Sequence, residues 1–349
     1  MATTELSRLP GLEAVTEHAH PMPGHYIERG PQKRLMVFSG RSHPELAGRI
    51  AENLGVQLGE IELTSFANGE TYCRYCESVR GADVFLVQTG CEPVDRNLME
   101  LLLMIQAAKL ASAKRITAVV PWFPYSRQDR KAKPREPISG RLVADMLQLA
   151  GADRVLTMDL HAGQIQGFFT IPVDHMTALP LFAQHFQDLG LTGEGVVSVA
   201  PDAGRAKYAL RFAEMIGADF AIMHKTRPAH DQVQMTEVTG RVRDRIAIVG
   251  DDVTTTGGTQ IHGAKALREH GATEVWMFVT HSLLDAEALE RVAADVTGVV
   301  IADTVPIDPV RMPHNVTVLT VSRLLADTIM NVFSDDSVSA IFGGENQLF

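Results

Sequence analysis

Short β-rich runs that alternate with longer amphipathic stretches constrain the fold of this chain more than any other feature. The alternation begins at Leu35 and continues along most of the 349 residues. It is typical of an α/β protein whose sheets are mainly parallel and are flanked by helices. The predicted strands lie at 35–38, 83–88, 116–120, 155–158, 196–199, 220–223, 246–249, 275–279 and 299–301.

The length predicts two domains, because an ordinary domain takes about 150 residues. Two of the predicted strands run on to a histidine, at His161 and His281, which is consistent with two related halves. Residues 1–33 mix prolines with glycines and show no sustained period, so we expect a mobile N-terminal extension. We expect no secretory signal there, because the apolar core segment and cleavage site of such signals are missing.

Charge and cysteine content narrow the class of partner. A formal net charge of -10 argues against a nucleic-acid binder, because clustered Lys and Arg supply most of the affinity for a polyanion. A local basic pocket can still bind small anions. Cys73, Cys76 and Cys91 form no disulfide framework and fit a reducing cytoplasm. The most apolar stretch, residues 98–110, is shorter than the ~20 residues that span a bilayer, so no membrane helix is expected.

A polar turn rich in glycine and threonine follows the predicted strand at 246–249, and a helical stretch begins near Gln260. Residues 256–259 offer hydroxyls and unhindered backbone N–H groups at a helix start, which favours binding of a phosphate. Asp251 and Asp252, just before the turn, can accept hydrogen bonds from the hydroxyls of a ribose. The turn therefore predicts a site for a pentose 5-phosphate.

A purely structural interpretation of this turn is that Asp251 and Asp252 cap the helix and the glycines ease the turn. A cap needs only one carboxylate, and a second, unpaired charge near a buried strand end would cost several kcal/mol. A ligand or metal partner for the pair is therefore the preferred interpretation.

The run Asp251-Asp252-x-x-x-Thr256-Gly257-Gly258-Thr259 resembles the loop that binds 5-phosphoribosyl 1-diphosphate (PRPP) in PRPP synthetases and type I phosphoribosyltransferases. The loop alone does not choose between these two kinds of enzyme. In either case the resemblance implies that ribose 5-phosphate is bound by Asp251, Asp252, Thr255, Thr256, Gly257, Gly258 and Thr259.

Residues 121–131, Pro-Trp-Phe-Pro-Tyr-Ser-Arg-Gln-Asp-Arg-Lys, combine aromatic rings with cations directly after a buried strand. A nucleotide needs both a flat apolar face and neutralisation of its phosphates, whereas a solvated basic loop explains only the charges. The segment is similar to the ATP-contacting stretch of PRPP synthetases, which phosphoribosyltransferases lack. The resemblance implies that Arg127, Gln128 and Asp129 bind ATP.

The run Asp-Leu-His-Ala-Gly-Gln-Ile-Gln-Gly-Phe-Phe at 159–169 follows another predicted strand. A lone histidine is usually a satisfied core residue. The whole run, however, is similar to a PRPP synthetase motif whose histidine lies at the ATP site and binds the catalytic Mg²⁺. The resemblance implies that His161 and Asp202 are the protein ligands, and two such ligands with phosphate oxygens and water suit Mg²⁺.

Three more groups of residues are interpreted through the same resemblance. Asn68-Gly69 predicts a hairpin, and its Phe66, Asn68 and Glu70 match residues that reach the ATP site of a neighbouring subunit, which implies a homo-oligomer such as a hexamer. Lys225 and Arg227 match two cations on a flexible catalytic loop, for which a solvated loop is the alternative. A regulatory site for phosphate and ADP is implied at Ser78, Arg80, Ser112, Ser337, Ser339 and Phe342.

The resemblance extends from residue 34 to residue 342 and identifies the chain as a member of the PRPP synthetase family. It implies two similar domains of the type I phosphoribosyltransferase fold, at 34–175 and 176–334, with the tail 335–349 joined to the first. It also implies Mg²⁺-dependent attack of the anomeric hydroxyl of ribose 5-phosphate on the β-phosphorus of ATP. The chain departs from the family pattern at Thr255, usually an aspartate, at Arg205, usually a glycine, and at Tyr208, often an arginine.

Two other functions stay open. A type I phosphoribosyltransferase would consume PRPP without ATP, and the 127–131 segment argues against it. A weakly active regulatory subunit that assembles with an active synthetase is favoured by the departures at Thr255, Arg205 and Tyr208.

Replacement of Lys225 by Ala tests the role that the resemblance implies for this cation. Phosphoryl transfer needs mainly positioning and charge neutralisation, and one well-placed cation is worth about three orders of magnitude in rate. We expect Lys225→Ala to lower turnover at least about a hundredfold, while the dissociation constant for ribose 5-phosphate changes little. Steady-state kinetics and equilibrium binding measure the two quantities, and near-normal turnover would remove Lys225 from the mechanism.

Overall fold

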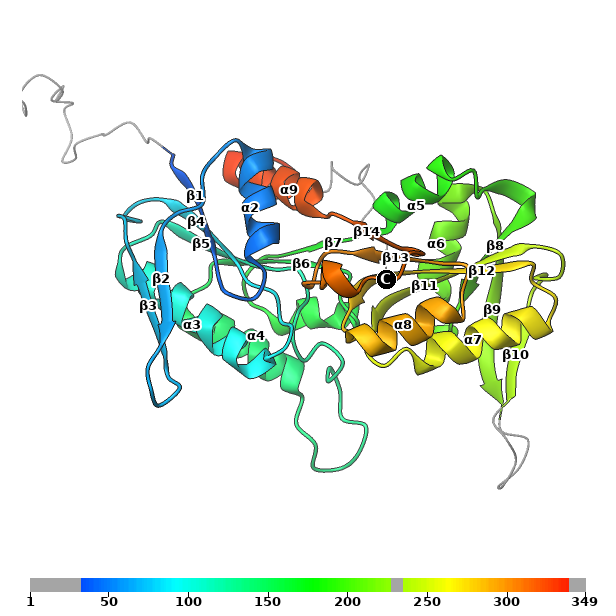
Figure 1. The fold of residues 1–349 in the computed structure, drawn as a ribbon. Coiled ribbons are helices and arrows are strands. Elements are labelled where there is room, and N and C mark those ends of the chain that lie inside the picture. The colour runs from blue at the N-terminus through cyan, green and yellow to red at the C-terminus, as the bar shows by residue number, and fades with distance from the viewer. Residues whose placement is uncertain (1–32, 227–234, 339–349) are drawn as a thin grey trace, which may run out of the picture. The chain divides into compact units, whose positions relative to one another are not determined.

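Two mainly parallel β-sheets form the framework of the protein (Figure 1). The computed structural model describes residues 33–226 and 235–338. The chain from Leu35 onward groups into one compact unit. Its first sheet is fully parallel and contains, in spatial order, β1 (Leu35–Ser39), β4 (Asp83–Val87), β5 (Arg115–Val120), β6 (Arg154–Met158) and β7 (Val173–Met176).

The second sheet has seven strands in the order β10-β9-β8-β11-β12-β13-β14. Among these described strands, β10 alone runs antiparallel to its neighbour. The chain moves outward from β8 in one direction and then restarts at β11 on its other side, so the order reverses between β8 and β11. Ligands of parallel sheets gather at the carboxyl ends of strands at such a reversal. The bounds are β8 (Val196–Ala200), β9 (Asp219–Thr226), β10 (Met235–Thr239), β11 (Ile246–Thr254), β12 (Glu274–Ser282), β13 (Gly298–Ala302) and β14 (Val316–Leu319).

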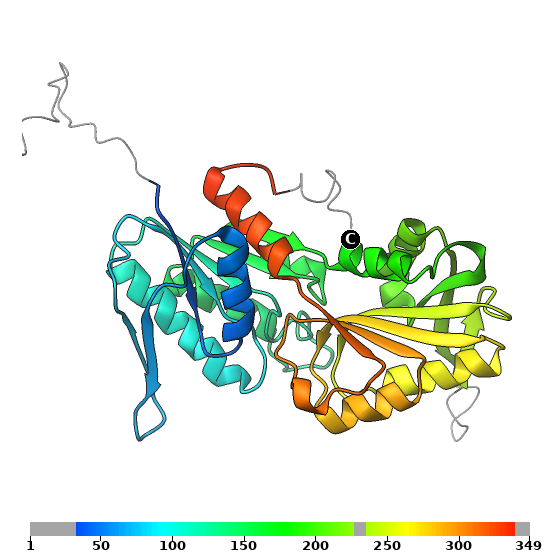
Figure 2. The ribbon, with the colours of Figure 1, turned by 45° about the horizontal axis from the view of Figure 1, so that its top comes forward.

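Helices cover both faces of each sheet (Figures 1 and 2). On the first sheet, α2 (Pro44–Leu54) and α9 (Ser322–Ser334) lie together on one face, and α3 (Val94–Leu110) and α4 (Ser139–Ala150) on the other. On the second, α5 (Leu179–Asp188) and α6 (Ala206–Ile216) oppose α7 (Gly258–Glu269) and α8 (Ala286–Ala294). A separate hairpin pairs β2 (Ile61–Ser65) with β3 (Thr71–Tyr75). None of the described helices is long and apolar enough to cross a membrane.

One apolar cluster packs against both sheets. On β12, the Phe278 ring lies 4.7 Å from Phe182 and 4.4 Å from Phe212, measured between ring centroids. The same cluster continues into α2 and α9, where Ile50 and Ile329 are fully buried. Because protein interiors are close-packed, this shared core fixes one sheet against the other.

The predicted α/β class with mainly parallel sheets is confirmed, and all nine predicted strands are present. Six of them agree with β1, β4, β5, β6, β8 and β13 within one residue at each end. The predicted strand at 246–249 is too short, because β11 stays paired with β12 as far as Thr254 and Ser282. The two predicted domain ranges stay predictions, and residues 1–32 of the predicted extension lie outside the described residues.

The carboxyl ends of β6 and β12 face each other, which brings the loops of both sheets to one place. The Thr280 hydroxyl donates to Asp159 Oδ2 at 2.6 Å, and His281 Nε2 lies 3.0 Å from the Met158 carbonyl oxygen. Burial lowers the pKa of His281 to about 4. The ring is therefore neutral at pH 7, and its Nε2–H donates to Met158.

Asp159 makes the stability of this junction depend on pH. Its side chain is buried, it accepts from Thr280 and from the Ala178 N–H, and burial raises its pKa to about 6. The folded pKa is raised, so the unfolded chain releases this proton first and stability falls as the pH rises from about 4 through 6. At pH 8, where Asp159 is ionised in both the folded and the unfolded state, its raised pKa lowers the free energy of unfolding by about 3 kcal/mol.

We therefore expect Asp159→Asn, which keeps an acceptor oxygen but cannot ionise, to gain stability over the wild type as the pH rises. The difference in free energy of unfolding should grow by about 1 to 2 kcal/mol between pH 5 and pH 8, measured by urea unfolding and circular dichroism. Asp327→Asn, at a half-exposed position on α9, is the control and should change stability by less than about 0.5 kcal/mol. A pH-independent difference for Asp159→Asn would contradict the assignment.

Candidate active site

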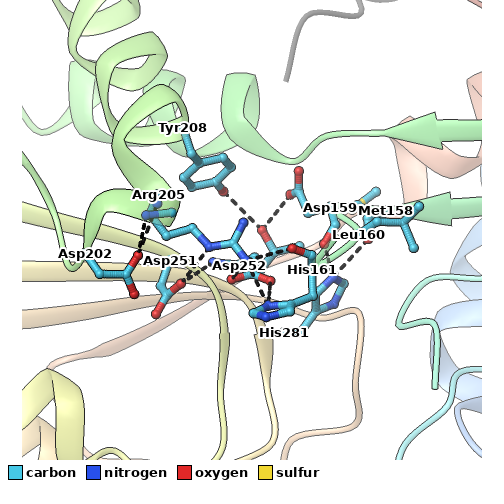
Figure 3. Close-up of polar contacts among 12 residues, drawn as sticks. Met158, Asp159, Leu160, His161, Asp202, Arg205, Tyr208, Asp251, Asp252 and His281 are labelled. Atoms are coloured by element: carbon cyan, nitrogen blue, oxygen red, sulfur yellow. Dashed lines mark hydrogen bonds and ion pairs between the residues drawn. The ribbon is translucent and has the colours of Figure 1, made fainter. Parts of the chain in front are cut away.

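A pocket of about 510 Å³ lies where the carboxyl ends of β6, β8 and β11 meet (Figure 3). Its lining comes from the segment after β6, which carries His161, from the turn after β8, which carries Asp202 and Arg205, and from Asp252 on β11. The pocket therefore lies at the reversal of strand order between β8 and β11, where ligand sites of such sheets are found.

The buried carboxylate of Asp252 lines this pocket and contacts two of its other side chains. Its Oδ2 lies 2.8 Å from His161 Nδ1, and its Oδ1 lies 2.9 Å from Arg205 Nη2. Only 3% of the Asp252 side chain is exposed, compared with 33% for His161 and 15% for Arg205. One segment from each sheet thus reaches the carboxylate of Asp252.

The contacts assign the protons of this cluster. Arg205 Nη2 donates to the His161 carbonyl oxygen at 3.0 Å and forms an ion pair with Asp252 Oδ1 at 2.9 Å. Nη2 also lies 2.8 Å from His161 Nδ1. An ionised carboxylate can only accept, so His161 Nδ1–H donates to Asp252 Oδ2 at 2.8 Å, which leaves Nε2 without a proton when the ring is neutral. A carboxylate that orients a histidine in this way is usual behind a metal ligand.

The pKa values of the two neighbouring carboxyl groups are shifted in opposite directions. Burial, together with the adjacent charge of Asp252, raises the pKa of Asp251 well above its usual value. Burial acts on Asp252 in the same direction, but the hydrogen bond from His161 and the charge of Arg205 outweigh it and lower the pKa of Asp252. Asp252 is therefore the more readily ionised member of the pair.

Asp202 lies in the turn after β8 and caps the short 3-10 helix η3 (Ala203–Arg205). Its Oδ1 accepts from the N–H groups of Gly204 at 2.8 Å and Arg205 at 3.2 Å. Within the described residues, no hydrogen bond reaches Oδ2 of Asp202. No group of three His, Cys, Asp or Glu side chains there is arranged to hold a metal. His161 and Asp202 both line the pocket, and His161 Nε2 and Asp202 Oδ2 are the atoms that they would offer to Mg²⁺ beside substrate oxygens and water. Their role as metal ligands stays a prediction.

The predicted phosphate-binding turn joins β11 directly to α7. Gly257 caps α7 with φ of 75°. A Cβ at this position would lie 2.3 Å from Val292 Cγ2, so only glycine fits without displacement. The helix begins at Gly258, two residues before the predicted start. The structure therefore places the predicted ribose 5-phosphate residues on one continuous strand, turn and helix start, which is the arrangement that offers N–H groups to an anion.

The predicted ATP contacts divide between two hollows. Arg127 and Gln128 line a second hollow of about 680 Å³ together with Trp122 and Tyr125. Asp129 lines the first pocket instead, where Gln164 donates a hydrogen bond to it. One short segment thus contributes to both hollows.

Phe66, Asn68 and Glu70 lie at the exposed tip of the β2–β3 hairpin, and none of them lines either hollow. Phe66 is 55% exposed and packs edge-on against Tyr72, with 5.7 Å between ring centroids. Within one chain, the structure does not bring these residues to His161. Their contribution to the site of a neighbouring subunit stays a prediction.

The remaining predicted residues are only partly described. Lys225 belongs to β9, in register with Thr236 of β10. Arg227, Ser339 and Phe342 lie outside the described residues. Ser78 and Arg80 precede β4, close to Ser112, whose carbonyl accepts from the Gly81 N–H at 2.8 Å, and the Ser337 carbonyl accepts from Asn331. The regulatory site stays a prediction.

Sequence reasoning missed two cations that line the hollows: Lys207 in the first pocket and Arg96, at the start of α3, in the second. Arg130, one of the cations of the 121–131 segment, received no individual role and lines the first pocket. The sequence singled out Arg205 only as a departure from a family pattern, although it contacts both His161 and Asp252. The sequence did offer one signal for Arg205: it is a cation where the family usually has glycine, close to the predicted metal ligand Asp202.

Comparisons with known proteins agree with the fold. A model of the N-terminal domain of ribose phosphate pyrophosphokinase matches residues 35–151, and a model of the phosphoribosyl synthetase-associated domain matches residues 227–343. The crystal structure of phosphoribosylpyrophosphate synthetase from Mycobacterium smegmatis is similar, with a TM-score of 0.81 and 44% identity. The match covers 87% of this chain and 100% of that one.

Two curated relatives carry the name ribose-phosphate pyrophosphokinase. The protein from Caldanaerobacter subterraneus is 46% identical and that from Fusobacterium nucleatum 45% identical, each over 309 residues. Each match covers 88% of this chain and 98% of the relative. Identity of this degree over almost the whole of both relatives shows that the chain belongs to the ribose-phosphate pyrophosphokinase family.

Proposed function

We propose that this chain transfers a diphosphate group from ATP to ribose 5-phosphate, giving PRPP and AMP. The contact between His161 and Asp252 carries the proposal. It joins the segment expected to hold the nucleotide and its metal to the strand expected to hold the ribose. The similarity to proteins named ribose-phosphate pyrophosphokinase supports the same activity.

The ribose side would be bound by β11 and the start of α7. Backbone N–H groups at residues 257–259 and the hydroxyls of Thr255 and Thr256 would take the 5-phosphate. Both oxygens of Asp252 are engaged by His161 and Arg205. Asp251, whose side chain is 16% exposed, is the member of the pair that can accept from a ribose hydroxyl.

The nucleotide side would be bound by the first sheet. Mg²⁺ held by His161 Nε2 and Asp202 Oδ2 would neutralise charge on the triphosphate. Arg127 and Gln128, beside the ring of Trp122, would position the nucleotide. Lys225 and Arg227 would stabilise charge that develops on the transferred group.

The transfer is a direct displacement. The anomeric oxygen of ribose 5-phosphate forms a bond to the β-phosphorus of ATP, and the bond from that phosphorus to the oxygen bridging the α and β phosphates breaks. AMP leaves with the bridging oxygen, and the proton of the anomeric hydroxyl passes to solvent. The chain's own residues supply alignment of the two substrates and charge neutralisation, so no covalent enzyme intermediate is needed.

We also propose a homo-oligomer, a hexamer by resemblance, in which the hairpin of one copy completes the site of another. The exposed ring of Phe66 at the hairpin tip supports this arrangement. Response to phosphate and ADP is the proposed role of the six regulatory residues named above.

An assay of AMP formation tests the proposed reaction. The chain is incubated with ATP, ribose 5-phosphate and Mg²⁺, and the products are separated by chromatography. We expect AMP and PRPP in equal amounts, and neither product when one substrate is left out. Nucleotide binding without AMP formation would indicate the regulatory subunit instead. Consumption of PRPP without any ATP requirement would indicate a phosphoribosyltransferase.

Gly257→Ala tests the phosphate-binding turn. The added Cβ would collide with Val292, and the residue would be strained at φ of 75°, so the turn must change shape. We expect KM for ribose 5-phosphate to rise at least about tenfold, while KM for ATP changes by less than about twofold. Equal effects on the two KM values would show that the turn does not serve the sugar phosphate in particular.

A further inference from the structure

The guanidinium of Arg205 lies against both members of the acidic pair. Nη2 is 2.9 Å from Asp252 Oδ1, and Nε is 3.6 Å from Asp251 Oδ1. The same Nη2 donates to the His161 carbonyl oxygen at 3.0 Å. Figure 3 shows the side chain extended from the start of α6 into this cluster. Arg205 is thus held by groups from both sheets rather than left free in the pocket.

The local backbone directs this side chain inward. Asp202 caps η3 and accepts from the Arg205 N–H, which fixes the position of residue 205 just before α6 begins. One turn later, Tyr208 is buried, and its hydroxyl lies 3.3 Å from the Thr280 hydroxyl. The start of α6 is therefore anchored on both sides of Arg205.

Charge explains what Arg205 does there. Adjacent carboxyl groups repel a phosphorylated sugar unless a cation offsets them, and that cation can be a bound metal or a side chain. Arg205 already supplies one positive charge to Asp251 and Asp252. A divalent cation on the same oxygens would lie beside the guanidinium, and the two positive charges would repel each other.

We propose that Arg205 is a built-in counter-ion of the Asp251–Asp252 pair, so that ribose 5-phosphate binds without a divalent cation of its own. The inference rests on the proposed function, because it concerns the same sugar phosphate site. The pair could hold ribose hydroxyls directly or through a metal. Arg205 selects direct binding, with Asp251 as the acceptor and Asp252 as the group that positions Arg205 and His161.

Isothermal titration calorimetry tests the inference. Ribose 5-phosphate is titrated into the full chain without nucleotide, once in EDTA and once in MgCl₂. For the wild type, we expect the two dissociation constants to differ by less than about threefold. Arg205→Gly should bind at least about tenfold more weakly in EDTA, equivalent to about 1.4 kcal/mol. It should recover most of that loss in MgCl₂, because the vacated oxygens can then take the cation. Arg205→Lys keeps the charge but loses the planar fork, so its loss in EDTA should be smaller.

Lys265→Gln is the matched control, because it removes the same charge from an exposed position on α7. Its Nζ is 3.8 Å from Asp295, and the side chain is 58% exposed. Binding by this variant should equal that of the wild type in both buffers. Circular dichroism and the urea midpoint establish that the Arg205 variants are folded.

Two results would overturn the inference. One is that the wild type fails to bind ribose 5-phosphate in EDTA and binds it in MgCl₂. This result is informative without any variant. The other is a folded Arg205→Gly chain that binds as tightly as the wild type in EDTA. Neither result bears on the transfer reaction, which fails only if AMP is not formed from ATP and ribose 5-phosphate.

Discussion

The pairing of the buried Asp252 carboxylate is the interaction on which the candidate site depends. An unpaired charge at that depth would cost several kcal/mol, so Asp252 must be matched by donors. His161 and Arg205 supply them, one from each sheet. The orientation of the His161 ring, the position of the guanidinium and the shape of the pocket therefore follow from one carboxylate. The apolar core around Phe278 holds the sheets in the relative position that makes this pairing possible.

Most of the fold could be predicted because buried parallel strands are almost continuous apolar runs. β7 and β14 escaped prediction, since each has four residues, lies at the edge of its sheet and includes polar side chains. The length of β11 was underestimated for a different reason. Asp251 and Asp252 have the composition of a loop, but Asp251, Val253 and Thr254 pair with β12, and this pairing keeps the backbone extended.

The candidate site could be predicted only where its residues are contiguous in sequence. The turn after β11 and the segment around His161 each carry their chemistry in a few neighbouring residues. The contact between His161 and Asp252 spans 91 positions, and no local pattern encodes it. Arg205 shows the same limit, because its residue type was visible in the sequence but its partners depend on how η3 and α6 are placed against β11. The ligands that these residues would bind stay predictions.

The final helix of the described chain, α9, lies on α2 near the beginning, and the Asn53 amide of α2 donates to the Ser322 hydroxyl of α9 at 3.1 Å. Leu46 and Ile50 on α2 share their apolar cluster with Leu325 and Ile329 on α9. Synthesis on the ribosome proceeds from the N-terminus. The first sheet therefore emerges from the ribosome long before α9, which covers part of one of its faces. The apolar side chains that α9 buries stay exposed until translation is nearly finished.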